Sequence, residues 1–318
     1  MSLDRIRLAS LHDKVISAEE ASAFIEDGMT VGMSGFTRAG EAKAVPLALV
    51  KRAHTNPLKI TLITGASLGN DLDKQLTEAG VLARRLPFQV DNTLRKAINN
   101  GEVMFIDQHL SETVEQMRNL QLKKPDVAII EAVAITEDGG IIPTTSVGNS
   151  ASFAIFAEKV IVEINTNLSP AFEGLHDIYI PTYRPTRQPI PLTQVDERIG
   201  THAINIDPAK IVGIVINNDL HDSPSTVTAP DDETQGMADH LIAFFEKEVA
   251  EERLPKNLGP LQAGIGSIAN AVLTGLKDSN FEDLVMYSEV LQDCTFELID
   301  AGKMKFASGS SITLSAKY

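Results

Sequence analysis

The segment Met286-Tyr287-Ser288-Glu289-Val290-Leu291-Gln292-Asp293, near the end of the chain, predicts both the fold class and a candidate site. The run Leu284–Tyr287 is short, apolar and bounded by polar residues, which is typical of a buried strand. From Val290 onward the apolar residues recur at helical intervals, which predicts a helix. Glu289 is therefore expected at a strand-to-helix turn, with Ser288 as the N-cap.

Glu289 is the first candidate for a functional side chain. In an open α/β sheet, the turn after a strand lies at the carboxyl edge, where ligands bind. The dipole of the predicted helix would keep Glu289 ionised, which suits a nucleophile and not a general acid. The alternative is an acidic residue that only stabilises the first turn of the helix, and position alone favours that alternative.

A second stretch, Leu261–Leu273, makes a functional site the better interpretation. It reads as an extended run, the two-glycine turn Gly264-Ile265-Gly266, and a helix over Ser267–Leu276. That single helix lies between the turn and Glu289, so a βαβ unit would place two parallel strands side by side. A glycine turn at the same sheet edge leaves backbone N–H groups open to a ligand, because no side chain blocks the approach.

The rest of the chain alternates apolar runs with amphipathic segments, which indicates parallel α/β sheets. Helices are expected over residues 17–27, 46–54 and 237–252. Strands are expected at Thr30–Ser34, Ile60–Ile63, Val103–Ile106, Val127–Ile130, Val160–Ile164 and Ile211–Ile216. The later runs are continuously apolar, which fits strands covered on both faces. The proline-rich segment 178–192 is expected to be a long ordered loop, and the polar segment 217–234 a linker.

Composition favours a soluble, cytoplasmic protein. The chain has 318 residues, and its formal charge of −15 argues against nucleic acid and anionic membranes as partners. Its single cysteine, Cys294, excludes an intrachain disulfide and is expected in the core. No apolar run approaches membrane-spanning length, and the histidines show no metal-ligand spacing. We therefore expect no membrane association and no metal site.

Five motifs, taken in order, resemble one protein family. They are Ser34–Gly40, Thr64–Ser67, Pro143–Asn149, Gly264–Ala271 and Tyr287–Asp293. In sequence and order they are similar to those of the acetyl-CoA hydrolase/transferase group of class I coenzyme A transferases. Succinyl-CoA:acetate and propionyl-CoA:succinate CoA-transferases belong to that group, and the resemblance covers nearly the whole chain.

The resemblance implies two tandem open α/β domains with parallel or mixed sheets, of the CoA-transferase (NagB/RpiA-like) type, the second incomplete. Residues 1–228 would form the N-terminal domain. Residues 229–318 would form the first part of the C-terminal domain, which carries the glutamate. Family members usually extend further, so the chain is expected to be C-terminally truncated, without a further glycine-rich loop and an active-site Asn. The resemblance also implies a homodimer.

For the site, the resemblance implies that Glu289 attacks the thioester of an acyl-CoA and that the Ile265 N–H stabilises the oxyanion. Coenzyme A is expected to contact the glycine turn and the following helix at Gly264, Ile265, Gly266, Ser267, Ile268, Ala269 and Asn270. A small carboxylate is expected at Gly35, Phe36, Thr37 and Ser67, where ordinary turn chemistry is an equal alternative. Coenzyme A is then a substrate, and no permanently bound cofactor is expected.

The activity implied is CoA transfer between acetyl-, propionyl- or succinyl-CoA and a small carboxylic acid. An acetyl-CoA hydrolase that uses the same glutamate is one alternative, and an inactive fragment is another. Arg84 and Arg85 are the remaining cationic candidates, and we expect a solvated pair in preference to a carboxylate pocket.

Overall fold

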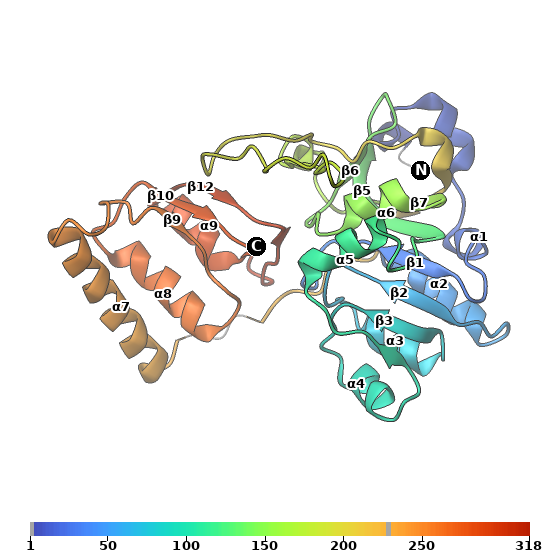
Figure 1. Cartoon of the computed structure of the whole chain (residues 1–318), viewed down its shortest axis with the longest axis horizontal. Coiled ribbons are helices and arrows are strands. Elements are labelled where there is room, and N and C mark those ends of the chain that lie inside the picture. The colour runs from blue at the N-terminus through green and yellow to red at the C-terminus, as the bar shows by residue number, and fades with distance from the viewer. Residues whose placement is uncertain (1–2, 227–229) are drawn as a thin grey trace. The chain divides into compact units, whose positions relative to one another are not determined.

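The computed structural model describes residues 3–226 and 230–318. It divides into two compact units, each described here by itself (Figure 1). Unit 1 extends to Ile190 and includes Ile199–Ser223, whereas unit 2 comprises Pro191–Arg198 and the chain from Pro224 onward. The domain boundary expected at residue 228 falls within 227–229, which lie outside the described residues.

Unit 1 is built on one sheet. Its strands are β1 (Thr30–Met33), β2 (Ile60–Ile63), β3 (Leu82–Leu86), β4 (Met104–Phe105), β5 (Val127–Ile135), β6 (Ile141–Pro143), β7 (Lys159–Asn165) and β8 (Ile211–Asn217). The order is β4-β3-β2-β1-β5-β7-β8 with all neighbours parallel, and β6 pairs antiparallel with β5. From β1 to β4 each new strand is added on one side of β1, whereas β5, β7 and β8 are added on its other side. The order in which strands are added therefore reverses between β1 and β5. Open α/β sheets bind ligands at such a switch point.

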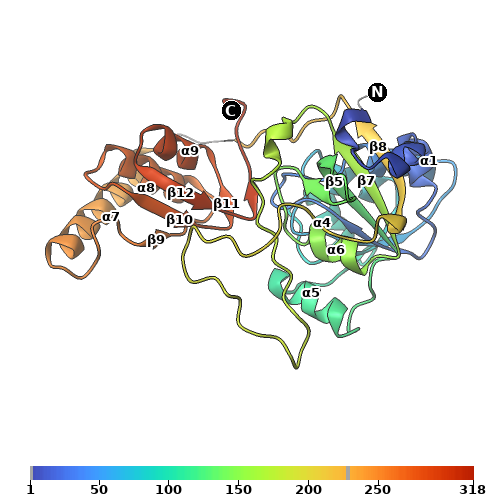
Figure 2. The same cartoon turned by 90° about the horizontal axis from the view of Figure 1, so that it is seen from above.

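Helices cover both faces of this sheet (Figures 1 and 2). They are α1 (Ala18–Ser22), α2 (Ala44–Ala53), α3 (Leu72–Glu78), α4 (Asn92–Asn99), α5 (Leu110–Arg118) and α6 (Ser150–Phe156), with 3-10 turns at Leu3–Arg5, Ala9–Lys14, Pro170–Phe172 and Pro208–Lys210. Val127 and Ile129 of β5 pack with α1 to α4, whereas Ala128 and Ile130 pack with α5 and α6. Successive strand residues point to opposite faces, so this alternation buries β5 on both sides, as its apolar run predicts.

Between Glu173 and Asp207 the proline-rich segment has no helix and no strand, but two isolated bridges, one between Ile178 and Thr201 and one between Ile204 and Ile141. It forms the long olive loop in Figure 2. The Asp177 carboxylate accepts hydrogen bonds from the backbone of Ile199 and Gly200, which closes the base of the loop. The prediction of a long ordered loop is confirmed.

Unit 2 is a smaller α/β unit. It contains α7 (Asp232–Ala250), β9 (Pro260–Leu261), α8 (Ser267–Asp278), β10 (Leu284–Tyr287), β11 (Val290–Leu291), α9 (Asp293–Asp300), β12 (Met304–Ser308) and β13 (Ser311–Ile312). Strand β10 lies between β9 and β12, parallel to both, and Leu261 pairs with Met286. The parallel βαβ unit expected around α8 is therefore confirmed. None of the helices in the described residues is long and apolar enough to cross a bilayer.

Cys294 lies in the apolar core of unit 2 with Leu273, Leu284 and Leu298. Burial raises the pKa of its thiol to about 11. Its thiolate is therefore scarce at neutral pH, as expected for a core cysteine and not for a nucleophile.

The helix predicted from Val290 begins later in the structure. Val290–Leu291 forms strand β11, which pairs with β13, and α9 starts at Asp293 with Gln292 as its N-cap. Ser288 is therefore not an N-cap, and Glu289 lies between two strands, outside the first turn of α9. The cause is tertiary, because a partner strand later in the chain overrides the local helical periodicity.

The first helix is shorter than predicted. Ser17 and Glu20 form a reciprocal capping box, as a helix start requires, but α1 ends at Ser22. The Arg52 side chain donates to the carbonyl oxygens of Ser22 and Ile25. These contacts satisfy carbonyl groups at the end of α1 without further helical turns.

The prediction of a solvated arginine pair is wrong for Arg85. This residue belongs to β3, a strand the sequence analysis missed, and its side chain is 0% exposed. Its Nε donates to Asp73 Oδ1 at 2.8 Å, and its other nitrogens donate to the carbonyls of Ala66 and Leu86. A buried guanidinium needs such a partner, and Asp73 supplies it from α3.

Candidate functional site

The loop after β1 forms a tight two-residue turn. The N–H of Phe36 donates to the Ala39 carbonyl at 2.9 Å, and the Ala39 N–H donates back at 3.2 Å. Between them, Thr37 and Arg38 have φ angles of 51° and 66°. Two successive positive φ angles are typical of a type I′ turn, which favours Asn and Gly. A β-branched residue in this region is strained, so the surroundings must enforce the conformation.

Neighbouring loops at the carboxyl edge hold this turn in place. Their contacts are Arg38 N to the Ser67 carbonyl at 3.0 Å, Ser146 Oγ to the Ala39 carbonyl at 2.8 Å, and Gly40 N to Asp222 Oδ2 at 3.1 Å. At Gly35, which has a φ of 122°, an added Cβ would lie 2.8 Å from the Cβ of Glu41. Only glycine fits there, because the backbone passes so close to the neighbouring side chain.

The structure brings together the loops that carry the residues expected to hold a carboxylate. Gly35 and Phe36 are buried beneath the turn, and the Thr37 hydroxyl donates to the Phe36 carbonyl at 2.7 Å. The Ser67 hydroxyl makes no hydrogen bond within the described part of the chain. The role of these four residues in binding substrate stays a prediction.

Sequence reasoning missed Arg38. Its side chain is exposed, and it makes no hydrogen bond or ion pair with any residue that the structure describes. The available signal was its place in the motif Ser34–Gly40, at the centre of the loop that leaves β1.

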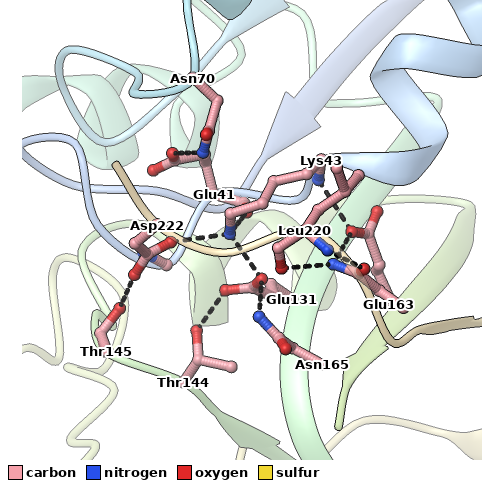
Figure 3. Close-up of polar contacts among 12 residues, drawn as sticks. Glu41, Lys43, Asn70, Glu131, Thr144, Thr145, Glu163, Asn165, Leu220 and Asp222 are labelled. Atoms are coloured by element: carbon pink, nitrogen blue, oxygen red, sulfur yellow. Dashed lines mark hydrogen bonds and ion pairs between the residues drawn. The ribbon is translucent and has the colours of Figure 1, made fainter. Parts of the chain in front are cut away.

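Below the turn lies a buried group of charges that we name the acid–lysine cluster: Glu41, Lys43, Glu131, Glu163 and Asp222 (Figure 3). The Lys43 ammonium lies 2.7 Å from Glu131 Oε1, 2.7 Å from Asp222 Oδ1 and 2.7 Å from the Glu41 carbonyl. Lys43 precedes α2 and Glu131 lies on β5, so the cluster spans the switch point of the sheet.

Glu163 of β7 binds the start of α2. Its Oε1 accepts hydrogen bonds from the backbone N–H groups of Lys43 and Ala44 at 2.9 Å each, and its Oε2 accepts one from Val45 at 3.1 Å. These N–H groups have no partner within the helix, and an anion at a helix N-terminus is favourable. Glu163 thereby fixes the loop that leads into α2.

The acid–lysine cluster contains more acids than bases, with four carboxyl groups around one ammonium. Burial raises the pKa of Glu41, and it raises the pKa of Glu131 to about 8. Burial alone would lower the pKa of Lys43, but the carboxylates of Glu131, Asp222 and Glu41 together raise it. The ammonium therefore stays charged, and at least one carboxyl of the cluster holds a proton at neutral pH.

The prediction of a linker over residues 217–234 is wrong for its first part. Asp222 pairs with Lys43 and accepts a hydrogen bond from the Thr145 hydroxyl at 2.7 Å. Ser223 Oγ accepts a hydrogen bond from the backbone N–H of Asn70 at 3.1 Å. Local polarity suggested a flexible segment, whereas these partners come from loops far apart in the sequence.

In unit 2, the glycine turn and the glutamate are linked through Ser288. The Ser288 hydroxyl donates to the Ala263 carbonyl at 3.0 Å and accepts from the Ala263 N–H at 3.3 Å. The Glu289 carbonyl accepts from Ser310 N at 2.8 Å. The backbone around Glu289 is therefore held on both sides, while its side chain is exposed.

The turn before α8 is open to solvent within unit 2. A Cβ added at Gly264 or Gly266 would meet no atom within 4 Å, and Gly266 has a φ of 139°. Ile265 and Ile268 are 61% and 51% exposed. Helix α8 has no side-chain N-cap, and its first backbone hydrogen bond is donated by Asn270. The preceding N–H groups have no partner within the helix.

Among the residues that the structure describes, no group of three or more His, Cys, Asp or Glu side chains is arranged to hold a metal ion. The polar groups at the loops after β1 and β2 and at the glycine turn before α8 are carboxylates, hydroxyls, the Lys43 ammonium, the Arg38 guanidinium and backbone N–H groups. Such groups suit anionic and carbonyl-containing ligands.

Several sequences and structures are similar to this chain. Succinyl-CoA:acetate CoA-transferase from Clostridium kluyveri is 45% identical over 311 residues, which cover 97% of this chain and 58% of that protein. Acetyl-CoA hydrolase from Kluyveromyces lactis is 43% identical over 322 residues, covering 98% and 61%. The chain therefore spans less than two thirds of the length of these curated relatives.

Solved structures share the fold at low sequence identity. RipA from Yersinia pestis superposes with a TM-score of 0.67 at 18% identity, covering 96% of this chain and 69% of that one. A 4-hydroxybutyrate CoA-transferase from Porphyromonas gingivalis gives 0.61 at 17% identity, covering 97% and 64%. The model of the acetyl-CoA hydrolase/transferase N-terminal domain matches residues 2–216. The chain belongs to the acetyl-CoA hydrolase/transferase family.

Proposed function

We propose that this chain carries the nucleophile of a CoA-transferase that exchanges coenzyme A between an acyl-CoA and a small carboxylic acid. The observation that carries the proposal is the linkage between Glu289 and the glycine turn through Ser288. An exposed carboxylate on a hydrogen-bonded backbone, linked through Ser288 to a turn with open N–H groups, supports this role, because acyl transfer needs a nucleophile and oxyanion donors held in fixed positions.

In the proposed reaction, a Glu289 carboxylate oxygen attacks the thioester carbonyl and expels the CoA thiolate. The product is an acyl–glutamyl anhydride. The thiolate then attacks the glutamyl carbonyl and releases the free acid, leaving a glutamyl-CoA thioester. A second acid reverses these steps and leaves as the new acyl-CoA. One thioester replaces another, so no other energy source is needed.

Each tetrahedral intermediate carries an oxyanion that needs a fixed donor. We assign that role to the backbone N–H of Ile265, and one such donor is worth about 2.7–4 kcal/mol. The residues Gly264–Asn270 would contact coenzyme A. Gly35, Phe36, Thr37 and Ser67 would form the carboxylate site, with acetyl-, propionyl- or succinyl-CoA as substrates. The protein is also proposed to form a homodimer.

A second candidate function is hydrolysis of acetyl-CoA. It is supported by the relative named acetyl-CoA hydrolase at 43% identity. Water would then intercept the anhydride or the glutamyl-CoA thioester formed on Glu289. Measuring acetyl-CoA consumption with and without succinate separates the two activities, because only a transferase converts succinate to succinyl-CoA.

The nucleophile is tested by Glu289→Gln in the full-length protein. The variant keeps the shape of the side chain but lacks the attacking anion, so CoA transfer should be lost while folding and CoA binding remain. Borohydride added with acyl-CoA should reduce a glutamyl thioester at Glu289 in the wild type only. Glu289→Asp should lose roughly a hundredfold in rate, because the carboxylate is withdrawn by one methylene.

Glu282 provides a matched control, because it is an exposed glutamate just before β10, whereas Glu289 follows that strand. Glu282→Gln should transfer CoA at the wild-type rate. A Glu289→Gln variant that keeps most of its transferase activity would show that the acid attacks the thioester directly, without a covalent intermediate.

A further inference from the structure

Gln292 belongs to the motif Tyr287–Asp293, but the proposed reaction gives it no role. It is the N-cap residue of α9, and its side chain makes no cap hydrogen bond. The usual N-caps are Ser, Thr, Asp and Asn, whose short side chains reach the first N–H groups of a helix. Gln292 is nevertheless only 9% exposed. A buried amide that does not cap its helix needs another partner.

The partner of Gln292 is the glycine turn. Its Nε2 donates to the Gly264 carbonyl oxygen at 3.5 Å, although the two residues are 28 positions apart. The Gly264 carbonyl and the Ile265 N–H are the two polar ends of one planar peptide group. This N–H is the proposed oxyanion donor, and it makes no hydrogen bond within the described residues. Gln292 therefore contacts the far end of the peptide group that would stabilise the oxyanion.

The backbone that carries the Gln292 amide is fixed on both sides. Strand β11, directly before it, pairs with β13, and the Gln292 carbonyl accepts the first hydrogen bond of α9 from Thr295 N at 2.9 Å. The Ser288 hydroxyl holds the carbonyl of Ala263, the residue before Gly264. Ser288 and Gln292 thus hold successive carbonyl groups of the turn.

Hydrogen bonds at the two ends of a peptide group strengthen each other, because polarising the carbonyl makes the N–H a better donor. When the Ile265 N–H donates to an oxyanion, electron density moves toward the Gly264 oxygen, which then attracts Gln292 more strongly. At 3.5 Å the contact is long for an N–H···O bond, so it contributes little before charge develops. An interaction that strengthens in the transition state raises kcat.

We propose that Gln292 is a positioning residue of the oxyanion site, which orients and polarises the Gly264–Ile265 peptide group through the Gly264 carbonyl. This inference rests on the proposed CoA transfer and deepens it. The contact lies wholly within unit 2. Because Gln292 acts through the peptide group and not on the substrate itself, its effect is expected on kcat and not on the KM for acyl-CoA.

The first test compares Gln292→Met with wild type in the full-length protein. Methionine has a similar length but no donor, so kcat should fall by about two- to tenfold, the worth of one uncharged hydrogen bond. The KM for acyl-CoA should stay at its wild-type value. A wild-type kcat, or a rise in KM with kcat unchanged, would overturn the proposal.

Gln235→Met is the matched control. Gln235 is an exposed glutamine on α7, and its Nε2 donates to Asp239 Oδ1 at 2.7 Å. The same substitution here removes a hydrogen bond of unit 2 that does not reach the glycine turn, so kcat and KM should be those of wild type. An equal fall in kcat in both variants would count against a specific role for Gln292.

Gln292→Glu adds a readout that a purely structural role would not change. A carboxylate has the shape of the amide but no donor, whereas the protonated acid can donate its O–H to the Gly264 carbonyl. The ratio of variant to wild-type kcat should therefore rise as pH falls toward the pKa of the introduced carboxyl, and the ratio cancels the titration of Glu289. A ratio that does not depend on pH would contradict donation to this carbonyl.

Nuclear magnetic resonance separates this inference from the proposed reaction. Glycine labelled with 13C at the carbonyl and isoleucine labelled with 15N give a signal from the Gly264–Ile265 peptide group, which Ile265→Val identifies by removing it. Loss of the hydrogen bond in Gln292→Met should move the carbonyl signal to lower frequency, whereas Gln235→Met should leave it in place. If the signal moves but the wild type transfers no CoA, the proposed reaction fails while the contact stands. If Gln292→Met leaves the signal unchanged, the positioning role is refuted.

Discussion

The Nζ of Lys43 lies 2.7 Å from Oε1 of Glu131, and neither side chain is more than 1% exposed. The pair joins the loop after β1 to strand β5 across the switch point of the sheet. The same ammonium contacts Asp222, whose other oxygen accepts a hydrogen bond from Gly40 at the base of the turn that presents Arg38. The buried pair therefore supports the loop on which the proposed carboxylate site depends.

Removing the ammonium should destabilise unit 1 strongly. Lys43→Met leaves buried carboxylates without their counter-ion, and breaking a buried pair in this way costs about 3–5 kcal/mol. The free energy of unfolding, measured by urea titration, should fall by that amount. Lys51→Met is the control, because the Lys51–Glu19 pair is exposed and should be worth at most about 1 kcal/mol. Equal effects of the two variants would contradict a structural role for Lys43.

The stability of unit 1 should depend on pH through Glu131. Its pKa is raised from 4.5 to about 8, so between these values the folded state binds a proton that the unfolded state has lost. The free energy of unfolding should therefore fall as pH rises through this window. Glu131→Gln removes this titration and should flatten the curve, with a residual slope from Glu41. Urea titrations at both ends of this pH window measure the free energy of unfolding of each protein. The same dependence on pH in the wild type and in Glu131→Gln would contradict a raised pKa at Glu131.

Gly40 should tolerate alanine less well than Gly80, although their φ angles are similar, at 68° and 70°. The left-handed conformation alone costs a non-glycine residue roughly 1–2 kcal/mol. At Gly40 a Cβ would also lie 2.9 Å from the Ser146 backbone nitrogen, whereas at Gly80 it would meet nothing within 4 Å. Gly40→Ala should therefore lower the free energy of unfolding more than Gly80→Ala does. Equal losses of unfolding free energy in urea titrations of the two variants would show that the loop at Ser146 moves to accommodate the added Cβ.

Ser288→Ala should slow CoA transfer without unfolding the protein. The substitution removes both hydrogen bonds to Ala263 and frees the glycine turn that carries the Ile265 N–H. We expect kcat to fall, whereas the KM for acyl-CoA should change little, because the lost contact positions the oxyanion donor. Steady-state kinetics and a thermal melting curve separate these effects. A wild-type kcat in a folded variant would show that Ser288 does not position the turn.

The sequence alone determined the α/β class and much of the strand pattern. Runs such as Val127–Ile130 and Ile211–Ile216 form strands in β5 and β8 as expected, because a continuous apolar run is stable only when covered on both faces. The βαβ unit around α8 was also predictable. Its glycine turn and helix are local signals, and a short crossover favours adjacent parallel strands.

Only the tertiary structure decided which side chains meet. Lys43 and Glu131 are 88 residues apart in the chain, and the sequence around each does not distinguish it from a charged residue on the surface. Strand β11 replaced the expected start of a helix because β13 supplied hydrogen-bonding partners. Arg85 was expected in solvent and is buried because Asp73 of α3 neutralises it. The periodicity of apolar residues indicates which apolar side chains are buried. The partners that stabilise a buried charge come from segments that only the fold brings together.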